Sequence, residues 1–136
     1  MAISDEELLH GFVSTGLPID QFHHEQHVRV AWLFVRDHGM PAALGEFSSA
    51  IKRFAEAKGK HGLYHETITW AFVLIIAERI ARTPADTWEA FAADNADVLS
   101  WQPSILDRYY SKDLLGSALA RATFVMPDLL LRPRRD

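Results

Sequence analysis

The chain has 136 residues, a formal net charge of -4 at pH 7 and 49% hydrophobic residues. This length and composition are typical of one folded domain with a real core, so we expect a single domain over residues 1–136, not a disordered or repetitive protein. The absence of cysteine excludes disulfides, thiolate metal sites and cysteine nucleophiles. The modest acidic charge gives no general attraction to nucleic acid.

Nothing in the sequence favours a membrane partner. The longest apolar run, residues 68–77, is far shorter than the roughly 20 residues that a membrane-spanning helix needs. The first residues are acidic where a secretory signal would be basic and then apolar, which favours a cytoplasmic location. At the other end, we expect residues 128–136, with the basic run Arg132-Pro133-Arg134-Arg135, to form a flexible C-terminal tail.

Helix start and stop signals divide the first half of the chain into three predicted helices. Ser4 before three acidic residues begins a helix over residues 4–15, and Gly16 ends it. Asp20 caps a second helix that continues to residue 38, where Gly39 ends it. A third helix is predicted over residues 41–58, because its apolar residues recur at three- and four-residue spacing.

The second half of the chain predicts one long helix followed by shorter ones. Residues 63–82 are apolar nearly all round and should form the most central helix. Further helices are expected at 84–93, 103–110 and 112–123, with residues 94–97 as a connection. Because no segment alternates between apolar and polar residues as a strand would, we predict an all-α, single-domain bundle of about five to seven helices.

The second and fourth predicted helices should begin at the same end of the bundle. Helices joined by short connections usually run antiparallel to their neighbours, so an up-down-up path makes the second and fourth helices parallel. Five of the seven histidines, at residues 23, 24, 27, 61 and 65, form two clusters near these two beginnings. The sequence therefore predicts that both clusters belong to one site.

The candidate ligands follow from the angular positions of these side chains. At about 100° per residue, His24 and His27 fall on the apolar side of the second helix, and His23 lies at the edge of that sector. Glu66 falls on the inward side of the fourth helix, with His65 at its margin. Buried polar groups need partners, so these side chains should meet.

A nitrogen-rich group of this kind is typical of a transition-metal site. The predicted metal ligands are His23 or His24, together with His27, His65 and Glu66, and zinc, iron, copper or nickel would each accept such a set. Glu66 is also the candidate catalytic residue, either as a ligand or as a proton acceptor from metal-activated water. The cofactor predicted from the sequence is thus a divalent transition metal.

A small molecule is the expected partner of this site. Tyr64, Thr69, His61 and Lys60 are the candidate ligand-binding residues, and the positive ends of two helices favour an anionic molecule. Three interpretations stay open: a metal-dependent enzyme, a metal-free acid–base or ligand pocket, and a structural hydrogen-bond network. In the last, the protein would be a non-catalytic ligand-binding domain or a homo-oligomeric interaction domain, such as a homodimer.

Two resemblances bear on this site. The segments Phe22-His23 with His27-Val28-Arg29-Val30-Ala31-Trp32, and Tyr64-His65-Glu66-Thr67-Ile68-Thr69-Trp70, resemble a family of small bacterial proteins. That resemblance covers most of the chain and implies no particular activity. In architecture, the chain also resembles the DinB-like four-helix bundles, which hold a metal with three histidines. There the His-x-x-x-His pair comes late in the chain, whereas His23 and His27 come early, so this likeness is one of design.

Overall fold

The computed structural model describes residues 3–129 and shows an all-α fold, as predicted. The described residues contain eight α-helices and no strand. The helices are α1 (Asp5–Val13), α2 (His24–His38), α3 (Ala42–Ala57), α4 (Glu66–Arg82), α5 (Trp88–Asp94), α6 (Ala96–Leu99), α7 (Lys112–Leu115) and α8 (Ala118–Ala122). Three short 3₁₀ turns lie between them: η1 (Ile19–Gln21), η2 (His61–Leu63) and η3 (Ile105–Arg108).

The two helices that carry the histidine clusters begin later than predicted. Residues 19–21 form the separate turn η1, and α2 begins only at His24. Gln26 accepts a hydrogen bond through Oε1 from the backbone N–H of His23 at 2.9 Å, which fixes the start of α2. Likewise, α4 begins at Glu66, because His65 caps it by accepting a hydrogen bond from the Ile68 N–H.

The C-terminal part of the fold is more divided than the sequence predicted. Residues 94–97, expected as a connection, contribute to the helix α6. Arg79 of α4 holds this segment through hydrogen bonds to Asp97 and Asn95. The predicted helix at 112–123 is split into α7 and α8, since Ser111 and Ser117 each cap a helix of their own. Side-chain capping therefore determines where α7 and α8 begin.

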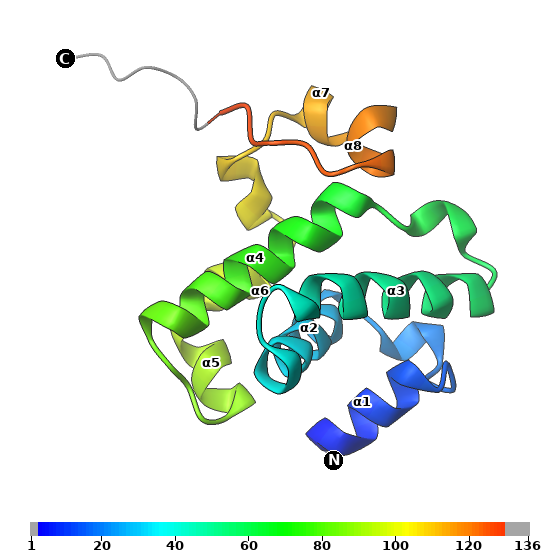
Figure 1. The fold of residues 1–136 in the computed structure, drawn as a ribbon, viewed down its shortest axis with the longest axis vertical. Helices are drawn as coiled ribbons and strands as arrows, with labels where there is room; N and C mark the ends of the chain where they lie inside the picture. The colour runs from blue at the N-terminus through cyan, green and yellow to red at the C-terminus, as the bar shows by residue number, and fades with distance from the viewer. Residues whose placement is uncertain (1–2, 130–136) are drawn as a thin grey trace.

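The helix α4 lies at the centre of the molecule. It packs against α2, α3 and α8, and Figure 1 shows it running diagonally with α7 and α8 near its beginning and α5 beyond its end. The core contains a large group of aromatic side chains, each at most 1% exposed: Phe12, Trp32, Phe47, Phe54, Phe72 and Phe91. The predicted central position of this helix is thus what the structure shows.

The beginnings of α2 and α4 lie at one end of the bundle. The ring of His24, at the start of α2, lies 5.0 Å from the ring of Phe72 in the first half of α4. Two turns further along α2, the ring of Trp32 lies 6.0 Å from that of Trp88, which follows the end of α4. The two helices therefore run in the same general sense, and their first turns share one end, as the loop lengths predicted.

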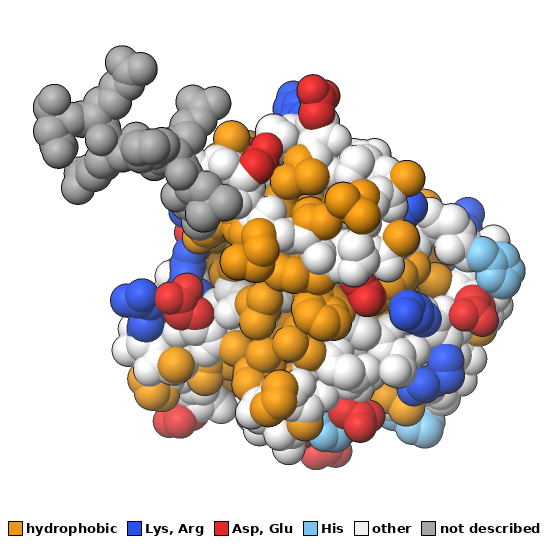
Figure 2. Space-filling model, turned by 45° about the horizontal axis from the view of Figure 1, so that its top comes forward, with side chains coloured by type: hydrophobic (Ala, Val, Ile, Leu, Met, Phe, Trp, Pro, Cys, Tyr) orange, Lys and Arg blue, Asp and Glu red, His pale blue; other side chains and the backbone are white. Residues whose placement is uncertain are grey.

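On the surface, apolar and charged side chains are both prominent. Figure 2 shows a band of hydrophobic side chains across one face, and Leu74, Leu119 and Met126 are among the exposed large apolar residues. No helix within residues 3–129 is long and apolar enough to cross a membrane. Of the predicted flexible tail, residues 130–136 lie outside the described part of the chain. Leu129 donates a backbone hydrogen bond to the Tyr109 carbonyl at 3.1 Å.

Candidate functional site

A pocket of about 320 Å³ lies where the first turns of α2 and α4 meet the end of α3. We call it the histidine pocket. Both His27 and His65 line it, so the two clusters that the sequence placed together do reach one cavity. Most of the lining is apolar, which is typical of small-molecule sites. The lining residues are Ile19, Phe22, His27, Ile51, Phe54, Ala55, Lys60, Leu63, Tyr64, His65, Ile68, Thr69, Trp101 and Arg121.

His27 is enclosed by aromatic rings. The ring centres of Phe47, Phe22 and Phe72 lie 5.4, 5.9 and 6.3 Å from that of His27. Its Nδ1 is buried and has no hydrogen-bond partner in the described part of the chain. Burial, with a smaller contribution from neighbouring His24, lowers the pKa of His27 to about 4. The imidazole is therefore neutral at physiological pH, so one ring nitrogen carries hydrogen and the other accepts.

His24 lies beside His27 but is anchored elsewhere. Its Nε2 donates a hydrogen bond to the Val98 carbonyl at 3.1 Å, which ties α2 to α6. Its ring is nearly parallel to that of His27, with centres 6.2 Å apart, and lies 5.0 Å from the ring of Trp101. Burial lowers the pKa of His24, although the bond to Val98 opposes this effect. This histidine therefore joins α2 to α6 beside the pocket.

Both ring nitrogens of His65 form hydrogen bonds within the protein. Nδ1 accepts a hydrogen bond from the Ile68 N–H at 3.1 Å, and Nε2 donates to the Leu115 carbonyl at 2.7 Å. The side chain is only 7% exposed. These bonds fix the neutral tautomer with hydrogen on Nε2, and they leave no lone pair for a metal. His65 therefore joins α4 to α7 and contributes only its ring surface to the pocket.

Glu66, the candidate catalytic carboxylate, is turned toward Tyr64. The Tyr64 hydroxyl donates a short hydrogen bond to Glu66 Oε1. Burial, and then this bond, raise the pKa of Tyr64 well above its ordinary value, so the phenol stays protonated. Tyr64 and buried Thr69 line the histidine pocket, whereas Glu66 is not among its lining residues. The predicted ligand-binding residues Tyr64 and Thr69 are thus in place.

The remaining predicted residues lie at or beyond the rim. Lys60 is exposed and lines the pocket. His61 is exposed and lines a smaller neighbouring hollow with Lys52 and Glu56. His23 is exposed in the turn before α2, so of the two alternatives it is His24 that points inward.

The described residues contain no group of three or more His, Asp or Glu side chains placed to hold a metal ion. His24 and His27 are the closest approach to such a group, since their rings are neighbours on one helix. The angular positions predicted the direction of these two side chains correctly. They could not predict that a third histidine, His65, caps α4 and donates a hydrogen bond to a carbonyl 50 residues away in the chain.

Among the lining residues that were not predicted as ligand-binding, two come from the C-terminal part of the chain. Arg121 of α8 reaches the pocket from the far end of the chain and donates through Nη1 to the Gly62 and Tyr64 carbonyls, at 2.7 and 3.2 Å. Trp101 is 48% exposed and lies at the opening of the histidine pocket. Together with His65, Ile68 and Arg121, it also lines an adjoining hollow. No local sequence signal marks either residue, because both depend on how the C-terminal helices fold back.

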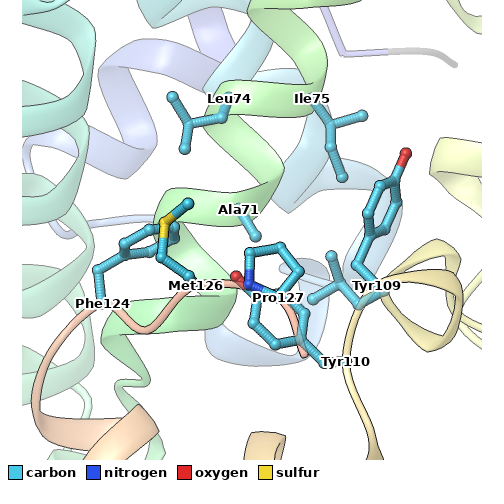
Figure 3. Close-up of a pocket in the computed structure, with 9 residues that line it drawn as sticks. Ala71, Leu74, Ile75, Tyr109, Tyr110, Phe124, Met126 and Pro127 are labelled. Atoms are coloured by element: carbon cyan, nitrogen blue, oxygen red, sulfur yellow. The ribbon is translucent and has the colours of Figure 1, made fainter. Parts of the chain in front are cut away.

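A second cavity, which we call the apolar groove, lies further along α4. It measures about 280 Å³, and no polar surface lines it. Figure 3 shows three walls: α4 on one side, the tyrosines after η3 on another, and the chain after α8 on the third. Its lining residues are Ala71, Leu74, Ile75, Leu106, Tyr109, Tyr110, Phe124, Met126 and Pro127.

Comparisons with known proteins leave the site to be interpreted from its own geometry. No family model, no curated protein and no solved structure matches the chain. The suggested resemblances to small bacterial proteins and to DinB-like bundles therefore stay predictions.

Proposed function

We propose that this protein binds a small, largely apolar organic molecule in the histidine pocket. The observation that carries the proposal is a single one: a neutral, unpartnered histidine at the base of a mostly apolar cavity. A buried ring nitrogen without a partner costs free energy, and such a cost is usually retained where function requires the group. Because Nδ1 of His27 is shielded, Nε2 is the nitrogen that a bound molecule would meet.

The remaining lining suits this use. Phe22, Phe54 and Ile68 supply apolar surface, and the Thr69 and Tyr64 side chains add polar groups. Tyr64 donates its hydrogen to Glu66, and this bond holds its hydroxyl in place. Few, well-placed polar groups in an apolar cavity are what orient a small ligand.

Binding of the neutral fluorophore N-phenylnaphthylamine tests the proposal. We expect one saturable site with enhanced emission, and we expect Ala55→Phe, which adds a ring to the pocket lining, to abolish it. Leu74→Phe makes the matched addition in the apolar groove and should leave that binding intact. If Ala55→Phe binds the probe like the wild type, the proposal is wrong.

A divalent transition metal on His24 and His27 is the second candidate, favoured by the proximity of the two rings on one helix face. The remaining coordination positions would fall to water or to the small molecule. Metal analysis of protein purified without a nickel column tests it. Bound metal should disappear with His27→Leu, and a chelator should lower Tm. Absent metal and identical melts would remove this candidate.

A further inference from the structure

The rim of the histidine pocket carries two cationic side chains and no acidic one. Lys60 and Arg121 line it, and the lining contains neither Asp nor Glu. In the described part of the chain, neither cation forms an ion pair, whereas Arg29, Arg79 and Arg108 each bind an aspartate. Two positive charges without an ion pair beside an apolar cavity attract a negatively charged group locally, against the net charge of -4 of the whole chain.

Arg121 is held in position while keeping donors free. Its Nη1 bonds to the Gly62 and Tyr64 carbonyls, which lie at the turn before α4. Within residues 3–129 its Nε and Nη2 donate no hydrogen bond, and Asp107 in the adjoining hollow forms no ion pair with it. A guanidinium edge anchored on one side and free on the other suits the two oxygens of a carboxylate.

We infer that the ligand of the histidine pocket is an amphipathic organic carboxylate. Its carboxylate lies at the rim between Lys60 and Arg121, and its apolar body extends inward toward His27. The inference rests on the proposed function, since it assumes that the cavity binds a small molecule. The neutral state of His27 agrees with this orientation, because an uncharged imidazole accommodates an apolar body beside it.

A matched pair of ligands tests the inference directly. Phenylbutanoate and phenylbutanamide share a body of suitable size and differ only in charge. By isothermal titration calorimetry on the full chain, we expect the acid to bind at least about tenfold more tightly than the amide. High salt should reduce that preference, because the charges lie at an exposed rim.

Substitutions then locate the effect. We expect Arg121→Gln and Lys60→Gln each to weaken the acid and to leave the amide unchanged, which also shows that the pocket remains folded. Arg53→Gln is the control, because Arg53 is exposed, unpaired in the described chain and absent from the pocket lining. It should change neither affinity.

Each other outcome has a definite meaning. Equal affinity for acid and amide would overturn the inference and leave the proposed function standing, as would N-phenylnaphthylamine binding with neither phenylbutyl compound. An acid preference that survives both rim substitutions would overturn the assignment of the carboxylate to Lys60 and Arg121. Failure of all three ligands would overturn the proposed function itself.

Discussion

The histidine pocket and the apolar groove use the same central helix in different ways. The start of α4, with its cap His65, gives Ile68 and Thr69 to the pocket, and later turns give Leu74 and Ile75 to the groove. The two cavities are similar in volume, about 320 and 280 Å³, but only the pocket presents polar surface in its wall. Apolar contact alone gives little orientation, so similar volumes do not imply similar selectivity.

The two regions also differ in what supports them. Behind the pocket lies a closely packed aromatic layer, in which Phe47, Phe54 and Phe72 are almost completely buried. The groove is closed on one side by the chain after α8, and its rim residues Leu74 and Met126 are 39% and 68% exposed. We therefore expect the pocket to be part of the cooperative core and the groove to open at lower cost.

The largest expected effect comes from removing a ring behind the pocket. Phe72→Ala should destabilise the fold by about 3–5 kcal/mol, because the ring is fully buried against His24 and His27. Leu74→Ala, two residues further along α4 at the rim of the groove, should cost less than about 1 kcal/mol, because that side chain is 39% exposed. Urea unfolding measures both, and equal losses would refute the contrast between the two regions.

The second effect is a pH dependence that arises mainly from His27 in the pocket. The pKa of His27 is about 4 when folded, against 6.5 for an ordinary histidine, mainly because of burial. The unfolded chain therefore takes up the proton first. Stability should be complete above pH 6.5 and fall by on the order of 3 kcal/mol as the pH drops to about 4.

Substitution isolates this contribution. His27→Leu should remove most of that loss, because leucine does not titrate and has a similar volume. His10→Gln changes an exposed histidine of α1 and should leave the pH profile as it is. Urea titrations between pH 6.5 and pH 4 measure the difference. A His27→Leu profile that follows the wild type would mean that His27 is not the group responsible.

Much of the fold, and part of the site, could be predicted from the sequence. Helical periodicity predicted the all-α fold, the central position of α4 and the inward direction of His24 and His27. These features depend on the angular spacing of residues within one helix and on the lengths of the connections, and both can be read from the sequence. The shared end of α2 and α4 followed from the same reasoning.

What the sequence could not predict depends on contacts between distant segments. The carbonyl of Leu115 accepts a hydrogen bond from His65, and the carbonyl of Val98 accepts one from His24. Arg121 reaches the turn before α4 across more than 50 residues. A histidine that caps a helix and one that could bind a metal look alike in sequence, since the difference lies in which carbonyl packs beside the ring.

The smallest of the three effects concerns the wall of the groove. Thr67 is fully buried, and its hydroxyl donates to the Thr123 carbonyl at 2.8 Å and accepts from the Val125 N–H at 3.1 Å. Thr67→Val removes both bonds while keeping the shape of the side chain. The cost should be about 1–3 kcal/mol, because two backbone groups lose their partner. The matched change Thr83→Val, at an exposed residue after α4, should be nearly neutral.

Hydrogen exchange of backbone amides shows which part of the structure Thr67→Val destabilises. If the groove is the less cooperative region, Thr67→Val should accelerate exchange of the Val125 amide far more than that of amides in α2 behind the pocket. Binding of N-phenylnaphthylamine in the histidine pocket should then persist at the wild-type affinity. Uniform acceleration throughout the chain would show instead that α4 couples the two cavities into one cooperative unit. Ligands of the pocket would in that case stabilise the wall of the groove as well.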